Sequence, residues 1–120
     1  MKIEEAQEII KKFDEERGWK GDWFIKDLSL NLVEEVGELW SLIKWIDEEK
    51  QRKVIEENKE EASDFIGDSL FLIFKIANKM DIDVETALKN TLKDYEKRFP
   101  PEETRKLKHG NKKAGGIDEK

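Results

Sequence analysis

The chain has 120 residues, which is enough for one domain with its own core but too few for two. Its formal net charge of −6 argues against nucleic acid as its main partner, because a phosphate backbone repels an acidic surface. The lack of cysteine excludes disulfides, thiolate nucleophiles and thiolate zinc sites. No apolar run reaches the length of about 18 residues that spans a membrane, and acids stand near the N-terminus where a signal peptide is apolar. We therefore expect a cytoplasmic protein with no membrane partner.

A first helix is predicted from Ile3 to Glu16, because its apolar residues recur at helical spacing. They are Ile3, Ala6, Ile10 and Phe13. Charged residues make up 43% of the chain and hydrophobic residues 37%, so the core is expected to be narrow and mostly helical. The helix is expected to stop at Gly18.

The following stretch, residues 19–29, has no sustained period and is predicted to be a loop, with Asp27 or Ser29 capping the next helix. Trp19 and Trp23 lie in this loop. Tryptophans in a small domain commonly bury a large area and would close one end of a bundle. They would alternatively form a stacking wall for a nucleobase.

Residues 28–45 are predicted to form an amphipathic helix that ends near Ile46. Its apolar face follows the spacing i, i+4, i+7 and i+11: Leu32, Val36, Leu39 and Ile43. Glu35 and Glu38 lie beside this face, and like charges at i, i+3 repel each other. The pair is either a solvated surface feature or half of a metal site.

Residues 47–57 are polar on nearly every side, which is typical of a solvated helix or a connector. A long helix is predicted over residues 58–80, and it is apolar around so much of its circumference that we expect it to be central and buried. Its polar stripe carries acids, followed by Lys75: Glu61, Asp64 and Asp68. Such acids repel one another unless they are protonated or bind a metal ion. Lys75 is expected to form a salt bridge near Asp68, or alternatively to contact a terminal phosphate.

A turn at residues 81–83 precedes a fourth helix that Pro100 and Pro101 end. Its apolar residues are expected to face inward: Val84, Ala87, Leu88, Leu92 and Tyr95. From about residue 102 the chain is basic and rich in glycine, so we expect a mobile tail. His109 in this tail is not expected to be catalytic.

These elements predict an all-α fold, a four-helix bundle with acidic clusters on two helices. Because the clusters contain no histidine, an oxygen-ligated Mg²⁺ or Mn²⁺ suits them, whereas a ferritin-like di-iron site needs Glu-x-x-His pairs. Mg²⁺ usually links carboxylates to substrate phosphates, so a phosphorylated ligand is expected. The apolar surface is too large for one bundle of this length, and we predict that dimerisation completes the fold.

Four short motifs, in this order, carry a family resemblance. They are EEVGEL at 34–39, Glu-x-x-Asp at 61–64 with Asp68 following, IDV at 82–84 and KRFP at 97–100. The chain resembles the MazG-like all-α nucleotide pyrophosphohydrolases, the superfamily of dCTP pyrophosphatases and dimeric dUTPases, over about residues 17–100. The resemblance implies one domain over residues 1–120 and Mg²⁺-dependent hydrolysis of a nucleoside triphosphate to the monophosphate and pyrophosphate. It also implies a homodimer or homotetramer that cleans the nucleotide pool.

The resemblance also implies the metal ligands. Glu35 and Glu38 match the first metal-binding pair of the family. The second pair is either Glu61 with Asp64 or Asp64 with Asp68, and Asp68 has the best spacing to the later motifs. Glu34, at i, i+4 from Glu38, is expected to orient the attacking water. The expected catalytic residues are therefore Glu34, Glu35, Glu38 and Asp68.

Aromatic and basic residues are expected to bind the substrate. Trp19 and Trp45 match positions that line the base pocket in the dCTP branch of the family, while Lys93 and Arg98 are phosphate-binding candidates, together with Lys75. Thr91 and Tyr95 stand where that branch has a lysine and an asparagine, so the base stays open.

Two alternatives remain at this point. The enzyme could be selective for dUTP or for a damaged or modified nucleotide, which the same metal site would serve. The chain could instead be a helical interaction module whose acids are surface charge, although unpaired acids on a buried helix are costly.

Overall fold

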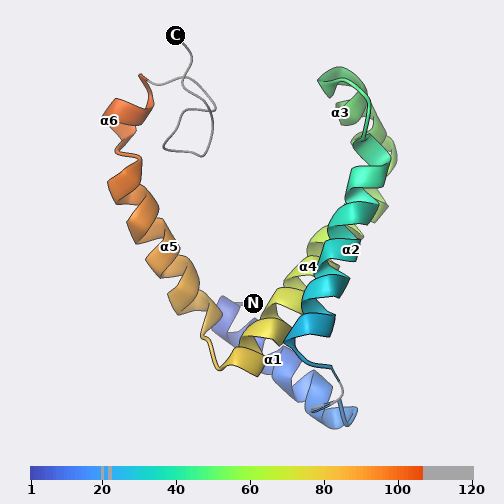
Figure 1. The fold of residues 1–120 in the computed structure, drawn as a ribbon, viewed down its shortest axis with the longest axis vertical. Coiled ribbons are helices and arrows are strands. Elements are labelled where there is room, and N and C mark those ends of the chain that lie inside the picture. Colours follow the sequence, from blue (N-terminus) through green and yellow to red (C-terminus); the bar gives the residue numbers. More distant parts are fainter. Residues whose placement is uncertain (20, 22, 107–120) are drawn as a thin grey trace. The chain divides into compact units, whose positions relative to one another are not determined.

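The computed structural model describes residues 1–19, 21 and 23–106. These residues form helices and no strand, which confirms the predicted all-α class (Figure 1). The helices are α1 (Ile3–Glu16), α2 (Ile25–Ile43), α3 (Glu48–Glu57), α4 (Lys59–Met80), α5 (Val84–Arg98) and α6 (Pro101–Thr104). They fall into two compact units, Met1–Val84 and Glu85–Lys120.

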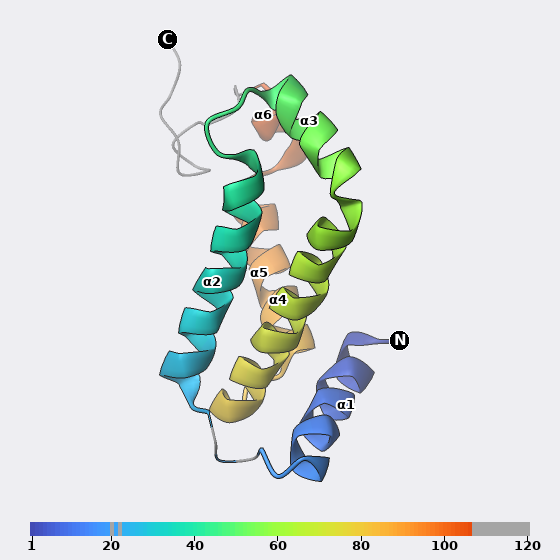
Figure 2. The ribbon, with the colours of Figure 1, turned by 90° about the vertical axis from the view of Figure 1, so that its right-hand side faces the viewer.

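In the first unit, α2 and α4 lie side by side and run in opposite directions, with α3 joining them and α1 packed on α4 (Figures 1 and 2). The buried apolar side chains come from α2 and α4: Leu28, Leu72, Phe74 and Ala77. The prediction that α4 is buried on most sides is wrong for the single chain, because Ile66, Leu70 and Ile73 are exposed. Its neighbours α1 and α2 leave this side uncovered.

Helix α2 begins and ends earlier than expected. Phe24 is extended and occupies the N-cap position, so Asp27 and Ser29 lie within the helix and do not cap it. The Ser29 hydroxyl instead donates a hydrogen bond to the Lys26 carbonyl, 2.9 Å away. The helix ends at Ile43 because Lys44 is extended and Trp45 has a φ of 68°.

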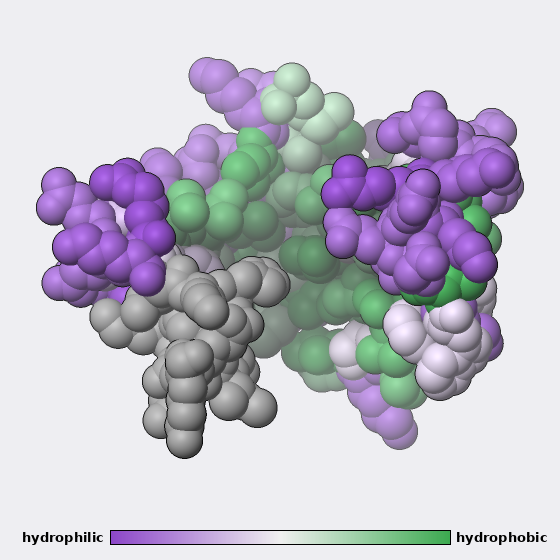
Figure 3. Space-filling model, turned by 90° about the horizontal axis from the view of Figure 1, so that it is seen from above, coloured by the Kyte–Doolittle hydropathy of each residue, from purple (hydrophilic) through white to green (hydrophobic). Residues whose placement is uncertain are grey.

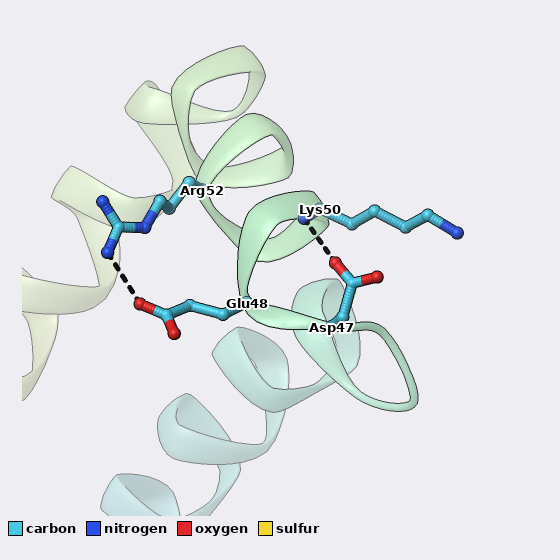
Figure 4. Close-up of polar contacts among 4 residues, drawn as sticks. All are labelled: Asp47, Glu48, Lys50 and Arg52. Carbon is cyan, nitrogen blue, oxygen red and sulfur yellow. Dashed lines mark hydrogen bonds and ion pairs between the residues drawn. The ribbon is translucent and has the colours of Figure 1, made fainter.

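The charge-rich stretch before α4 is a helix, one of the two forms expected for it. The Asp47 carboxylate caps α3 by accepting a hydrogen bond from the Lys50 backbone N–H at 2.9 Å. One turn further, Arg52 forms an exposed ion pair with Glu48 at 2.6 Å (Figure 4). Both contacts are local to α3, and the helix also packs against α2 and α4.

The turn after α4 is tied to α1 by one side chain. Asp81 ends α4 in the left-handed conformation, with a φ of 56°, which aspartate tolerates better than most residues. The Gln7 side-chain amide donates to the Asn78 side chain at 3.1 Å and to the Ile82 carbonyl at 2.8 Å. Its carbonyl oxygen accepts from the Val84 N–H at 2.9 Å. Gln7 therefore fixes the chain where α5 begins.

In the second unit, α5 ends at Arg98, and α6 begins at Pro101 with Pro100 as its N-cap, so the chain does not become irregular at residue 102 as expected. Within this unit Leu88, Leu92 and Tyr95 are exposed, and the expectation that they face inward stays a prediction. The rest of the predicted tail, with His109, lies outside the described residues. Within the described part of the chain, no helix is long and apolar enough to cross a bilayer.

Candidate active site

A cavity of about 280 Å³ lies in the first unit and is lined by α2, α4 and the segment before α2. We call it the aromatic cleft. Helix α2 contributes Asp27, Leu28, Asn31 and Glu35, helix α4 contributes Asp68, Phe71, Leu72 and Lys75, and the preceding segment contributes Trp19 and Trp23. Apart from the adjacent pairs Asp27 with Leu28 and Phe71 with Leu72, successive residues of each helix are three or four apart, which places them on one helical face.

The walls of the cleft are aromatic. The rings of Trp19 and Trp23 meet edge to face, with centroids 5.1 Å apart. Phe13 of α1 supports both Trp19, at 5.9 Å, and Phe71, at 5.6 Å. Trp19 thus lines the cleft, as the resemblance implies, and also packs against α1.

Lys75 lines the cleft but does not pair with the acids of its own helix. Its ammonium lies 3.4 Å from the Asp14 carboxylate of α1, and both side chains are buried. The expected salt bridge near Asp68 is therefore wrong. About two helical turns, or roughly 10 Å, separate Lys75 from Asp68 along α4, whereas α1 brings Asp14 directly to Lys75.

The acids of α2 and α4 form an electrostatic cluster around Glu35. Partial burial raises the pKa of Glu35 above its usual range, and the negative charges of its neighbours raise it further. In order of effect, these neighbours are Glu38, Asp68, Glu34 and Asp64. Glu35 and Asp68 line the cleft from facing helices. The structure thus brings together most of the carboxylates that the sequence selects.

Glu61 is the exception among the predicted metal ligands. It is exposed, and it is not among the charges that raise the pKa of Glu35, whereas both Asp64 and Asp68 are. Of these two, Asp68 lines the cleft. Asp64 and Asp68, and not Glu61, are therefore the α4 acids whose charges raise the pKa of Glu35, and the choice of the second metal-binding pair stays a prediction.

The chemistry of this donor set fits a divalent cation. The cluster offers only carboxylate oxygens, which are the ligands that Mg²⁺ and Mn²⁺ prefer, and it contains no imidazole or thiolate. Glu35 is surrounded by like charges, a repulsion that a bound cation would relieve. Among the residues that the structure describes, no three acidic or histidine side chains converge closely enough to hold an ion. The acids are gathered, and their side chains point to no common centre.

The other predicted substrate residues lie outside the cleft. Trp45 does not line it, is 88% exposed and makes an edge-to-face contact with Trp40 at 6.1 Å. Lys93 and Arg98 belong to α5 in the second unit. There Arg98 pairs with Asp94 at 3.5 Å and lies over the rings of Tyr95 and Phe99.

Sequence reasoning missed four residues of this region: Asp14, Asp27, Asn31 and Phe71. Asp14 had a readable signal, because it continues the inward spacing of Ile3, Gln7 and Ile10 along α1. Asn31 is likewise four residues before Glu35 on the same helical face. Asp27 was assigned to a cap, which concealed its place in the cleft.

Comparisons with known proteins find a family of nucleotide-hydrolysing domains and a similar solved structure. The model of the MazG nucleotide pyrophosphohydrolase domain matches residues 25–101. The fold is similar to the crystal structure of a pyrophosphatase from Archaeoglobus fulgidus, with a TM-score of 0.73 and 26% sequence identity, covering 82% of this chain and 92% of that chain. A comparison with curated proteins finds no match.

Proposed function

The chain belongs to the MazG nucleotide pyrophosphohydrolase family, and we propose that its aromatic cleft is the site where it hydrolyses a nucleoside or deoxynucleoside triphosphate. The products are the monophosphate and pyrophosphate. The matched region, residues 25–101, crosses the boundary between the two compact units, which supports a functional domain with residues from both units; its extent over residues 1–120 stays a prediction.

One observation carries this proposal. Glu35 and Asp68, from two facing helices, line the same cavity as Trp19 and Trp23. Carboxylates suit the metal–phosphate end of a nucleotide, and aromatic rings suit the base. A surface cluster of acids would not be expected to share a cavity with two tryptophans.

The reaction is an in-line displacement at the α-phosphorus. A Mg²⁺ bound by Glu35, Glu38, Asp64 and Asp68 would lower the pKa of a water molecule and offset negative charge on the phosphates; Mn²⁺ would serve similarly. The water oxygen forms a bond to the α-phosphorus, while the bond from the α-phosphorus to the α,β-bridging oxygen breaks. Its electron pair leaves with pyrophosphate. Glu34, adjacent to Glu35, orients the water and takes its proton.

Several finer points stay predictions. Lys93 and Arg98 are proposed to contact the phosphates, and Trp45 is proposed to contact the base. None of the three residues lines the aromatic cleft. Glu61 remains a candidate outer ligand. Cleaning of the nucleotide pool and a cytoplasmic location are also still predictions from the sequence.

We also propose that the enzyme is a homodimer or homotetramer. Figure 3 shows hydrophobic residues at the surface of the single chain. Those on α2 and α4 recur at helical spacing: Leu30, Val33, Trp40, Ile66, Leu70 and Ile73. An apolar helical face of this kind marks a protein interface more often than a free surface.

The proposed activity is tested by measuring pyrophosphate release from a panel of canonical and modified nucleoside triphosphates with Mg²⁺. We expect release from the wild type and a loss of at least about a hundredfold in kcat/KM for Glu38→Gln and Asp68→Asn, because each substitution removes a negative ligand of a metal that stabilises the transition state.

The matched control is Glu56→Gln, an exposed acid of α3 that pairs with Lys59 outside the cleft. It should retain wild-type activity. All variants are checked for helical content by circular dichroism. Silence of the folded wild type across the panel, or full activity of both cluster variants, would contradict the proposal.

A further inference from the structure

The ammonium of Lys75 is buried among aromatic rings, and the carboxylate cluster of α2 and α4 gives no reason for this position. Only 5% of Lys75 is exposed, and its Nζ lies 4.8 Å from the ring centroid of Trp23, 5.3 Å from Trp19 and 5.4 Å from Phe71. On its other side it pairs with Asp14. A buried lysine held by three rings and one carboxylate has little freedom to move.

Asp14 belongs to α1, outside the region that the family model matches. It is 8% exposed, and its Oδ1 accepts no hydrogen bond from the described residues. Its contact with Lys75 is thus an electrostatic one, which holds the ammonium beside the rings. Asp14 also neutralises the lysine charge, so burying the pair costs less than burying either charge alone.

The position of Lys75 suits the base end of a nucleotide rather than its phosphates. Lys75 lies about two helical turns, or roughly 10 Å, from Asp68 along α4, which leaves room for a sugar between them. The cleft volume of about 280 Å³ is at the small end for ligand pockets, which suits one base rather than a whole triphosphate. A polyphosphate would also have to lose its hydration against three aromatic rings, for a cation already paired with Asp14.

We propose that Lys75, positioned by Asp14, determines base specificity by donating a hydrogen bond to a carbonyl oxygen of the base, an inference that rests on the proposed function. A lysine ammonium is a donor only, so the edge facing it must offer an acceptor. Uracil, thymine, cytosine and guanine carry such a carbonyl, whereas adenine presents an amino group in its place. The substrate class is therefore a nucleotide with a carbonyl-bearing base, and adenine nucleotides are disfavoured.

Asp14 is a positioning residue in this scheme, because it acts through Lys75. Without its charge, the ammonium would gain freedom and lose part of its preference for the cleft. Asp14→Asn should therefore weaken discrimination between bases while leaving the carboxylate cluster of α2 and α4 in place.

The test measures binding of nucleosides without phosphate or metal, through quenching of tryptophan fluorescence in the cleft. Two matched pairs of probes are used: inosine with purine riboside, and uridine with 2,4-dithiouridine. In each pair only the first carries a base carbonyl. We expect the wild type to bind the carbonyl member of at least one pair about tenfold more tightly, as for one hydrogen bond to a charged donor.

The decisive variant is the double substitution Asp14→Asn with Lys75→Met. It removes both charges, because loss of one partner alone leaves a buried charge and endangers folding. For the probe pair that the wild type discriminates, we expect the double variant to bind the two nucleosides with affinities that differ by less than about threefold. The control is Glu48→Gln with Arg52→Met, which removes the exposed ion pair of α3 (Figure 4) and should bind as the wild type does.

The kcat/KM values of the same proteins are then compared for UTP, CTP, GTP and ATP with Mg²⁺. ATP should be the poorest substrate of the wild type, and the double variant should no longer discriminate against ATP. A purely structural role would weaken binding of both members of a pair equally and leave their ratio unchanged. Three results would overturn the inference. The double variant could keep the wild-type ratio, the wild type could bind both members of each pair equally, or no nucleoside could quench the fluorescence. The binding ratios need no turnover, so a failure of pyrophosphate release would count against the proposed function alone.

Discussion

Glu35 shows at the scale of one residue how the like charges of the acidic cluster oppose one another in the folded chain. Its raised pKa means that the folded chain holds the proton more tightly than the unfolded chain, so stability falls as pH rises through the folded pKa. Glu35→Gln should therefore stabilise the metal-free protein at pH 7. The gain should be about 0.2–0.5 kcal/mol per relieved like-charge pair. It should vanish at a pH below the ordinary carboxyl range, where both proteins are neutral at this position.

Thermal unfolding of the metal-free proteins at pH 7 and pH 3, followed by circular dichroism, measures this difference. With millimolar Mg²⁺ and nucleotide the order should reverse, because a ligand that binds only the folded state stabilises the wild type by mass action. Glu56→Gln is the control, since Glu56 pairs with Lys59 and its removal should give no gain. A Glu35→Gln protein less stable than the wild type at pH 7 without metal would contradict the cluster described here.

At the scale of the helix, Gln7 links α1 to the turn that follows α4. Its side chain makes hydrogen bonds with Asn78, Ile82 and Val84. Each such bond contributes about 0.5–1.5 kcal/mol, so Gln7→Ala, which removes all three, should lower the free energy of unfolding by about 1.5–4.5 kcal/mol. Denaturation in urea measures the change.

Glu8→Ala is the matched control for Gln7→Ala, because Glu8 is the next residue of α1 and is exposed. Its effect should stay within about 0.5 kcal/mol, as for most surface positions. If both substitutions destabilise the protein equally, Gln7 does not fix this turn.

Helical periodicity predicted most elements because it depends on local spacing. It placed α1 at its observed bounds and α4 within one residue of its observed start. It failed at the start of α2, where Phe24 caps the helix by backbone conformation alone, without a side-chain hydrogen bond. It also treated Asp14 as one more charged residue, because its partner Lys75 lies on another helix and their pairing depends on how α1 packs on α4.

The carboxylate cluster was predictable for a related reason. The acids of α2 and of α4 each follow a helical repeat, and their positions relative to the family motifs select Glu35, Glu38 and Asp68 before any coordinates. The register of α2 against α4 decides that Glu35 and Asp68 line the same cleft and that the charge of Glu61 does not act on Glu35. That register follows from packing around Leu28 and Leu72, which periodicity alone does not set.

At the scale of the whole molecule, the predicted core is larger than the core that one chain buries. Leu70 on α4 is 49% exposed and Val36 on α2 is 50% exposed, although the sequence pattern places both among the apolar residues of their helices. Leaving such surface in water costs about 25 cal/mol for each Å². A second copy of the chain, the partner that we propose, would offer a matching surface of apolar helices.

We therefore expect the wild type to elute at no less than twice its 14.2 kDa chain mass when size-exclusion chromatography is combined with light scattering. Leu70→Glu should shift the equilibrium towards the monomer by tenfold or more, because it places a charge in an apolar contact at a cost of at least about 1.4 kcal/mol. The position is exposed in the single chain, so the monomer should keep its helical content. Lys53→Glu on α3, an exposed charge reversal, is the control and should assemble as the wild type does. A wild type that is monomeric at micromolar concentration would show that the exposed faces of α2 and α4 have another role.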